Sequence, residues 1–250
     1  GNTGLLEIPS ARFMQEGSFK IGVNSSHPYQ MTPFTATPFS WMEATFRWTE
    51  VKNQLYGPSF YSGNQTLKDK SFDLKFRLIE ESDLLPNVAI GWRDIGGTGL
   101  FSSEYLVASK QIRNFDLTAG IGWGQLGRAS NIKNPLIQAH ETFRSRVRDY
   151  GTRGGGLNYH AWFSGEDVAF FGGLEYRFKR YRTRLKLEYD TSNQDNALYP
   201  LEKIKVDSRI NIGLSFPLGR WGEYSFGYQR GNSVQFSFFL KGNYSEDNLV

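Results

Sequence analysis

The sequence has 250 residues, a formal net charge of +4 at pH 7 and no cysteine, which excludes disulfide bonds and cysteine-ligated metal centres. Its basic residues alternate with acidic ones instead of forming one run, which argues against nucleic acid as a partner. Aromatic residues make up 16% of the chain, hydrophobic residues as a whole only 39%, and the mean hydropathy is −0.49. This mixture is typical of a protein with aromatic bands on its surface and a polar interior.

Hydrophobic residues follow the two-residue period of β-strands along most of the chain. In residues 72–78 (FDLKFRL), Phe72 and Leu74 share one face while Asp73 and Lys75 share the other. Twelve segments of about 9–11 residues, the length that a tilted strand needs to cross a membrane, are predicted as strands. They are residues 18–25, 29–37, 40–49, 71–79, 87–93, 101–109, 115–124, 167–178, 183–191, 206–216, 223–230 and 234–241.

The connections between these strands are predicted to alternate between short and long. The short ones are residues 80–86, 110–114, 178–182 and 217–223, and the long ones are residues 49–70, 125–165 and 191–205. Short turns on one side and long loops on the other are typical of an outer-membrane β-barrel, in which the short turns face the periplasm.

Aromatic residues gather near the predicted strand ends, where they would form the two interface girdles of such a barrel. They are Trp41, Trp48, Trp92, Tyr105, Trp123, Tyr176, Tyr181, Tyr189, Trp221, Tyr224 and Tyr228. No run of about 18 apolar residues occurs, so a transmembrane helix is excluded. No charged segment precedes an apolar stretch at the N-terminus, so we expect that a secretory signal has already been removed.

We therefore predict an all-β protein: a closed antiparallel transmembrane β-barrel of about 12 strands in the bacterial outer membrane. Residues 1–17 are expected to form a periplasmic N-terminal segment, residues 18–241 the β-barrel, and residues 242–250 a periplasmic C-terminal tail. Both termini then lie in the periplasm, and outer-membrane lipid and lipopolysaccharide surround the barrel.

The glycine-rich stretch at residues 94–110, DIGGTGLFSSEYLVASK, could be a phosphate-binding loop or the end of a hairpin. It lacks the lysine of a phosphate-binding loop, and a predicted strand follows it instead of a helix, so we favour the hairpin. The three histidines, His27, His140 and His160, have no metal-ligand spacing. We expect no catalytic, cofactor-binding or metal-binding residue, no cofactor and no enzymatic activity.

The polar faces of the predicted strands carry many charges that would point into the lumen. This lumen-lining charge ladder comprises Glu43, Arg47, Lys75, Arg77, Arg93, Glu175, Arg177, Lys186, Glu188, Asp190, Asp207 and Arg209. The side chains could pair across strands and fill a narrow barrel, or line a hydrated channel for a polar or anionic solute. We favour the filled lumen.

The long connection at residues 125–165 is expected to be a mobile extracellular loop, or else to fold inward as a plug or gate. It carries a basic cluster of Arg144, Arg146, Arg148 and Arg153. These guanidinium groups would offer charge-assisted contacts to a sugar acid or to a lipopolysaccharide phosphate.

Several segments give the chain a specific resemblance. They are GNTGLLEIPSAR (1–12), WMEATFRWTE (41–50), KDKSFDLKFRLIEE (68–81), DIGGTGLFSSEYLVASK (94–110), FGGLEYR (171–177), LKLEYD (185–190) and GYQRGN (227–232). The chain resembles the YjbH family of outer-membrane β-barrel proteins associated with exopolysaccharide biosynthesis and secretion. The resemblance implies an envelope protein acting with a polysaccharide and a periplasmic or lipoprotein export partner.

The sequence departs from the family pattern in two ways. Members of the family are often longer, and this chain ends in KGNYSEDNLV without the terminal aromatic residue of many barrels. It is therefore interpreted as a short member or as the N-terminal barrel of a longer protein. We expect a non-enzymatic role in exopolysaccharide export or surface assembly. A diffusion porin for sugar acids or other polar solutes and a lipid-modifying enzyme are the alternatives.

Overall fold

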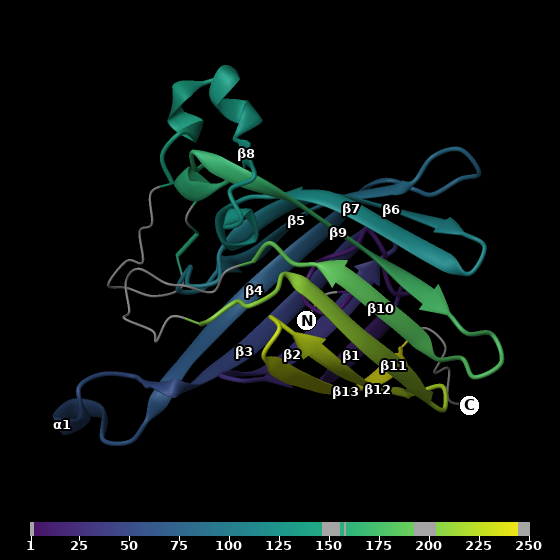
Figure 1. Cartoon of the computed structure of the whole chain (residues 1–250), viewed down its shortest axis with the longest axis horizontal. Coiled ribbons are helices and arrows are strands. Elements are labelled where there is room, and N and C mark those ends of the chain that lie inside the picture. The colour runs from purple at the N-terminus through teal and green to yellow at the C-terminus, as the bar shows by residue number, and fades with distance from the viewer. Residues whose placement is uncertain (1–2, 147–155, 158, 193–203, 245–250) are drawn as a thin grey trace.

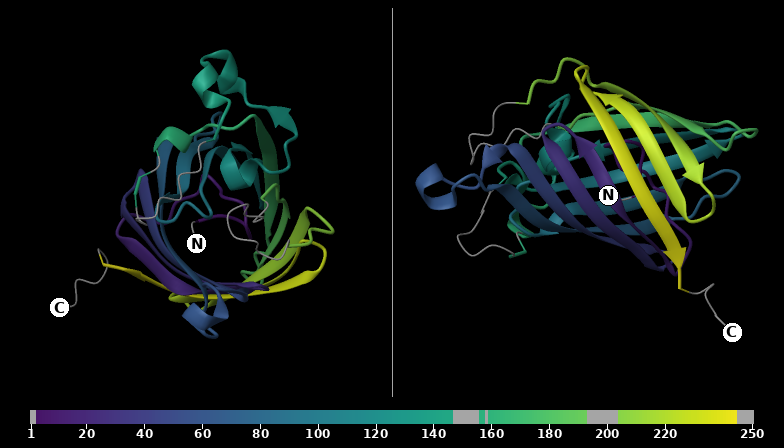
Figure 2. Two further views of the ribbon diagram at one scale, coloured as in Figure 1. Left: turned by 90° about the vertical axis from the view of Figure 1, so that its left-hand side faces the viewer. Right: turned by 90° about the horizontal axis from the view of Figure 1, so that it is seen from below.

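Twelve antiparallel strands close into a barrel in the computed structural model, which describes residues 3–146, 156–157, 159–192 and 204–244 (Figures 1 and 2). The strands are β1 (Ser18–Ser26), β2 (Tyr29–Phe39), β3 (Met42–Leu55), β4 (Thr66–Ile79), β5 (Asn87–Gly96), β6 (Ser103–Ile112), β7 (Phe115–Gly122), β9 (Asp167–Arg177), β10 (Arg184–Tyr189), β11 (Ile210–Leu218), β12 (Gly222–Gln229) and β13 (Ser233–Asn243). All twelve predicted strands are present, and the predicted fold class is confirmed.

Closure comes from strands far apart in the sequence. β1 pairs with β13 from Ser18 opposite Asn243 to Ser26 opposite Gln235, and β9 pairs with both β7 and β10. A two-residue strand, β8 (Ile132–Lys133), adds to the end of β9 and was not predicted. Because every strand of the barrel pairs on both sides, the barrel has no open sheet edge.

Helical structure is confined to short turns in the described residues. They are α1 (Ser59–Ser62) and the 3₁₀ turns η1 (Gly124–Gly127), η2 (Pro135–Gln138), η3 (Glu141–Phe143) and η4 (Tyr159–Ala161). None of these helices has the length and apolar character needed to cross a membrane.

Several strands extend beyond their predicted ends, and β3 and β4 extend furthest. β3 continues to Leu55 and β4 begins at Thr66, so the pair projects from the barrel as a long hairpin with α1 at its tip (Figure 1). In contrast, β11 begins at Ile210, four residues later than predicted. The backbone N–H groups of Asp207 and Ser208 both donate to the carbonyl of Arg230, so this stretch forms part of the rim instead of the ladder.

The two ends of the barrel differ in their connections. The turn-side end, where β1 begins and β13 ends, carries the connections at residues 40–41, 80–86, 113–114, 178–183 and 219–221. The loop-side end carries those at residues 27–28, 56–65, 97–102, 123–166, 190–209 and 230–232. The predicted alternation of short and long connections is therefore incomplete, since residues 27–28 and 230–232 are tight turns on the loop-side end.

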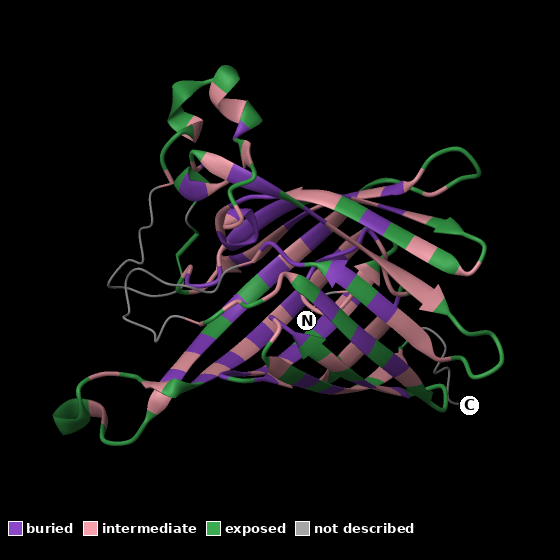
Figure 3. Cartoon of the chain, viewed as in Figure 1, coloured by how far each residue is buried: buried purple, intermediate pink, exposed green. Residues whose placement is uncertain are grey.

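Buried and exposed residues alternate along the strands (Figure 3). Side chains thus alternate between the two faces of the wall as predicted, which gives the barrel an apolar outside and a polar inside. In β11, Ile210 is 51% exposed and Ile212 47% exposed, whereas Asn211 between them is 1% exposed. A water-soluble barrel would show the reverse, because its apolar side chains would fill the interior.

The barrel itself runs from Ser18 to Asn243, so its C-terminal limit lies two residues beyond the predicted one. The predicted C-terminal tail at 242–250 thus begins within β13, and residues 245–250 lie outside the described residues. The N-terminal segment lies inside the ring of strands instead of extending away from it (Figure 2).

Candidate functional site in the barrel lumen

Residues 3–13, here called the plug, lie in the lumen and fold back on themselves through a backbone bridge between residues 4 and 9. The wall holds the plug on several sides. The carboxylate of Glu188 on β10 accepts hydrogen bonds from the backbone N–H groups of Leu6 and Glu7 at 2.9 Å and of Ile8 at 3.3 Å. Asn211 on β11 donates to the same carboxylate at 2.9 Å. One buried acid therefore satisfies three consecutive peptide groups that form no strand or helix of their own.

A buried ion pair on the opposite wall holds both ends of the plug. Lys75 on β4 lies 3.1 Å from Glu43 on β3, and both side chains are at most 1% exposed. Glu43 accepts from the backbone N–H of Thr3 at 2.9 Å, and Lys75 donates to the carbonyls of Arg12 at 2.6 Å and Thr3 at 3.3 Å. A buried ion pair is stable only when its remaining hydrogen-bonding groups also find partners. The plug backbone supplies these partners to the Lys75 ammonium and the Glu43 carboxylate.

The C-terminal part of the plug is fastened near the turn-side rim. The Arg12 guanidinium donates to both carboxylate oxygens of Asp116 on β7, at 2.8 and 2.7 Å, and pairs with Glu81 in the connection at residues 80–86. Burial disfavours the charged form of Glu81, but hydrogen bonds from Arg12 and from the Gln111 backbone outweigh it and hold the pKa of Glu81 below its ordinary value. Arg12 thus ties the plug to two neighbouring hairpins.

Two further cations grip the middle of the plug through its backbone. Arg93 on β5 donates to the carbonyl of Glu7 at 2.6 Å, and Lys186 on β10 donates to that of Leu5 at 3.0 Å. The Gln229 side chain on β12 donates to the Glu7 carboxylate at 3.1 Å. Most of these contacts reach peptide groups, so they depend on the path of the plug more than on its side chains.

An apolar cluster inside the lumen completes the packing of the plug. Ile8 and Ala11 pack against Ala89 on β5, Tyr105 on β6 and Phe171 on β9, together with Val107 and Leu126. Tyr105, expected in an interface girdle, faces inward and is completely buried. That expectation was wrong because Tyr105 shares the two-residue period of Ser103 and Val107, which face the lumen.

The glycine-rich connection at residues 97–102 folds into the loop-side mouth. Leu100 and Phe101 are at most 5% exposed and join Tyr29, Met31, Val51 and Leu67 in a second inward cluster. Asp94, at φ 53°, accepts from the Phe101 N–H at 2.9 Å, and the Arg47 guanidinium lies 5.7 Å from the Phe101 ring. The segment is a hairpin connection, as expected, whose tip narrows the mouth.

Gly97 is required at the base of this connection. A Cβ there would lie 2.6 Å from the carbonyl oxygen of Lys70 and 3.1 Å from the Cα of Ser71, both backbone atoms of β4. The glycine therefore permits the close approach of two backbones.

The long connection at residues 123–166 divides its contacts between the mouth and the outer rim. Leu126 in η1 is completely buried in the lumen cluster. Arg146 covers the outward-facing Glu104 on β6 with contacts at 2.7 and 2.9 Å, and the Phe163 N–H donates to the same carboxylate at 2.9 Å. Both interpretations of the loop were therefore incomplete, since its described part neither fills the barrel nor stands free of it.

The predicted basic cluster of this loop does not form one surface in the described residues. Arg146 is engaged with Glu104, whereas Arg144 pairs with Glu141 on the exposed turn η3. Arg148 and Arg153 lie outside the described residues. Sequence reasoning missed Glu104, although a carboxylate on the same outward face as Leu106 is itself a signal for a buried partner.

The predicted charge ladder is divided by the structure into two groups. Glu43, Arg47, Lys75, Arg77, Arg93, Glu175, Lys186, Glu188 and Asp190 lie in the lumen or at its rim. Arg177 is exposed at the end of β9, Asp207 pairs with Lys205 at 2.8 Å outside the barrel, and Arg209 donates to the Asp190 carbonyl at the loop-side rim.

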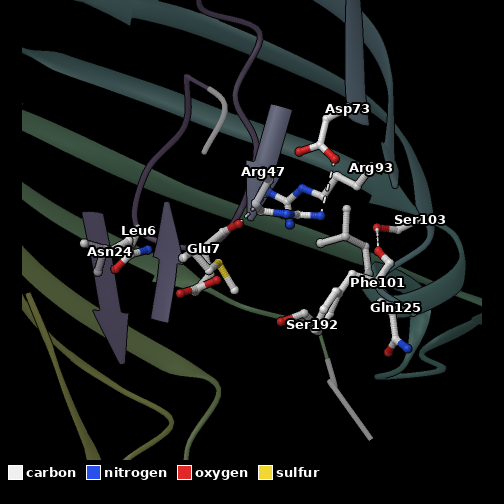
Figure 4. Close-up of a pocket in the computed structure, with 12 residues that line it drawn as sticks. Leu6, Glu7, Asn24, Arg47, Asp73, Arg93, Phe101, Ser103, Gln125 and Ser192 are labelled. Carbon is white, nitrogen blue, oxygen red and sulfur yellow. Dashed lines mark hydrogen bonds and ion pairs between the residues drawn. The ribbon is translucent and has the colours of Figure 1, made fainter. Parts of the chain in front are cut away.

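Among the described residues, space remains beside the plug in at least two cavities. One, of about 40 Å³, is bordered by Glu7 of the plug, by Arg47 and Arg93 of the wall and by Phe101 of the inward loop (Figure 4). Figure 4 also shows Asp73 beside Arg47, and their side chains are 3.3 Å apart. The other, of about 220 Å³, lies toward the turn-side end.

The lumen is therefore a largely filled polar interior with residual space beside the plug. In the described residues no group of three or more histidine, aspartate or glutamate side chains could hold a metal ion. The chemistry of the site is hydrogen bonding to peptide groups of the plug and ion pairing between side chains.

Comparison with known proteins extends these observations. A solved chain from work on the in-meso crystallization of membrane proteins covers 92% of this chain and 85% of its own length, with 9% identity and a TM-score of 0.39. A mutant of the Rh. blastica porin covers 87% of this chain and 56% of its own length, with 9% identity and a TM-score of 0.31. Likenesses this weak have no bearing on function.

The sequence comparisons are far more specific. The chain is 41% identical over 249 residues to the protein named "Uncharacterized lipoprotein YjbH" of Escherichia coli (strain K12), a match that covers 98% of this chain and 35% of that protein. The chain thus spans about a third of that relative's length. The model of the YjbH family, described as "Exopolysaccharide biosynthesis protein YbjH", matches residues 1–250. Matched along its whole length, the chain belongs to the YjbH family of proteins linked to exopolysaccharide biosynthesis.

Proposed function

We propose that the chain is a plugged outer-membrane barrel that takes part in exopolysaccharide export or surface assembly without catalysing a reaction. The observation that carries this proposal is the inverted polarity of the wall, apolar outside and charged inside, around a plug held by Glu188, Lys75 and Glu43. An apolar outer surface of closed strands suits a lipid bilayer. Membership of the YjbH family supports the part of the proposal that concerns exopolysaccharide.

The proposed orientation has the turn-side end in the periplasm. Short turns face the periplasm in barrels of this kind, and here β1 begins and β13 ends on that side. A periplasmic or lipoprotein partner would then meet the turns beside Arg12 and Glu81. The relative's name as a lipoprotein is compatible with a place in the envelope. The longer connections would face lipopolysaccharide outside the cell.

An experiment in the bacterium that makes the protein tests the proposal. Deleting its coding region is expected to lower the amount of exopolysaccharide at the cell surface, and restoring the full-length protein is expected to recover it. The protein should fractionate with the outer membrane and migrate faster on a gel before heating than after. Unchanged surface polymer in the deletion strain would contradict the proposal.

A gated pore for acidic solutes is the second candidate. It is favoured by the fact that hydrogen bonds and ion pairs hold the plug, so the plug could leave the lumen without breaking a covalent bond. Planar-bilayer recordings separate the candidates. A steady current through the intact protein that an acidic oligosaccharide blocks would favour the pore, and a closed barrel would favour the scaffold.

The lipid-modifying enzyme has less support. His27, His140 and His160 are all exposed in the structure, and the Nδ1 of His140 contacts the Thr142 hydroxyl at 2.9 Å within its own turn. Turnover of phospholipid by the purified protein, lost on H140N or H160N substitution, would restore this alternative.

A further inference from the structure

The larger cavity of the lumen has a strongly basic lining. Its volume is about 220 Å³, and the plug residues Thr3 to Leu6 separate it from the rest of the lumen. Lys20 on β1, Arg184 and Lys186 on β10, and Lys241 on β13 line it, whereas the only carboxylate in its lining is that of Glu223 on β12. All five residues lie near the turn-side ends of their strands.

Two of these cations stand directly opposite each other. Lys20 on β1 is the register partner of Lys241 on β13, and both strands direct these residues into the lumen. Like charges at directly opposed positions destabilise an antiparallel pair. An arrangement that costs stability in this way calls for a compensating anion.

The neighbouring acids compensate only part of this charge. Glu223 accepts a hydrogen bond from Lys241 at 2.7 Å and also pairs with Arg184. Glu175 on β9 lies farther away, 3.8 Å from Arg184 and 3.9 Å from Lys186. Within the described residues Lys20 forms no ion pair, and its ammonium lies 5.2 Å from the Phe239 ring. The buried Glu43 carboxylate, which pairs with Lys75, attracts Lys20 from beyond ion-pair distance.

The remaining lining suits the hydroxyl groups of a sugar. Ser225 on β12 and Ser237 on β13 present hydroxyls 2.5 Å apart, and the Gln235 amide donates to Asn24 at 2.9 Å beside them. These groups lie farther from the turn-side rim than Lys20 and Lys241 do. A ring with one carboxylate could therefore place its charge near the lysines and its hydroxyls against the serines.

We propose that this cavity binds the carboxylate of an acidic sugar unit, with Lys20 and Lys241 as the principal cationic contacts. The volume is below the range of about 300–1,000 Å³ typical of larger ligands, which restricts the occupant to a single small unit. Charge-assisted hydrogen bonds to two ammonium groups would offset the like-charge repulsion. The identification of the anion as a sugar unit rests on the proposed exopolysaccharide role, whereas the anion site stands on the geometry alone.

Titration calorimetry on the purified full chain in detergent tests this proposal with three probes: a trigalacturonate, a neutral trisaccharide and inorganic phosphate. The trigalacturonate is expected to bind and the neutral sugar not to bind. The K20Q substitution should lower the affinity for trigalacturonate at least tenfold. The K20R substitution, which keeps the positive charge, should retain most of this affinity. K133Q is the matched control, because the exposed Lys133 pairs with Glu166 of the long connection and with Asp167 at the start of β9.

Equal binding of the neutral sugar, or trigalacturonate binding that K20Q leaves unchanged, would overturn the proposal. If phosphate binds in a way that depends on Lys20 but trigalacturonate does not bind, the cavity is an anion site and its ligand is not an acidic sugar. Unaltered gel mobility of the unheated variants shows that they are folded. The amount of surface polymer in the deletion strain tests the proposed exopolysaccharide role separately. The anion site and the exopolysaccharide role can therefore fail independently of each other.

Discussion

Lys75 and Glu43 form an ion pair at 3.1 Å inside the barrel, and both are buried beneath the plug. Removing one partner leaves the other charge buried without compensation, which typically costs about 3–5 kcal/mol. We therefore expect K75M to lower the free energy of unfolding by about that amount, measured by urea titration of tryptophan fluorescence in detergent.

The control for this measurement is K133M, which removes an exposed cation and should leave the free energy of unfolding nearly unchanged. The double variant K75M/E43Q should lose less free energy of unfolding than the two single variants lose together, because the two side chains contact each other. Additive losses would show that the pair does not act as a unit.

The plug determines whether the barrel conducts ions. Deleting residues 3–13 removes the peptide groups that Glu188, Lys75 and Lys186 hold, and leaves a charged lumen that water can enter. A twelve-stranded barrel is wide enough to contain such a channel. We expect the intact protein to be silent in planar bilayers and the deletion variant to show steady open-channel currents.

Deleting residues 59–62, which form α1 outside the barrel, provides a control that should remain silent. A correctly folded plug deletion that also remains silent would mean that other segments close the lumen.

Acidification should loosen the turn-side anchor of the plug. The pKa of Glu81 lies below its ordinary value in the folded protein. The contact with Arg12 therefore stabilises the plug fully when the pH is above the ordinary glutamate pKa of about 4.3. This stabilisation is lost as the pH falls through the lowered pKa of Glu81. Hydrogen exchange of the plug amides should therefore be slow at pH 6 and faster below about pH 4, relative to the intrinsic rates.

In R12Q the pKa of Glu81 should return toward its ordinary value, because its principal hydrogen-bond donor is gone. Because Glu81 then no longer holds the plug, the plug amides should exchange faster at pH 6, and the acceleration below about pH 4 should disappear. An R12Q profile identical to that of the intact protein would reject the anchor.

The buried contact between Arg146 and Glu104 should hold the long connection on the outer rim. In E104Q the guanidinium keeps its carbonyl contacts with Ala161 and Ser164 but loses its carboxylate partner. We expect limited proteolysis within residues 128–146 to become at least tenfold faster. R144Q, which breaks only an exposed pair with Glu141, should leave the cleavage rate unchanged.

The local pattern of the sequence was sufficient to locate the strands and to assign most of their faces, Tyr105 being an exception. Phe72, Asp73, Leu74 and Lys75 alternate as predicted, with the apolar members outside and the charged ones inside. The two-residue period of an extended chain depends only on neighbouring residues, so it can be recognised without knowledge of the fold. The same pattern accounts for all twelve barrel strands.

Only the tertiary structure decided what fills the barrel. Residues 3–13 have no period that marks them as a plug, and their partner Glu188 lies 182 positions from Leu6 along the chain. The pairing of β1 with β13 and the opposition of Lys20 and Lys241 likewise arise from closure. A sequence pattern records which side chains face the lumen, whereas the contacts they make there depend on segments that the fold brings together from distant positions.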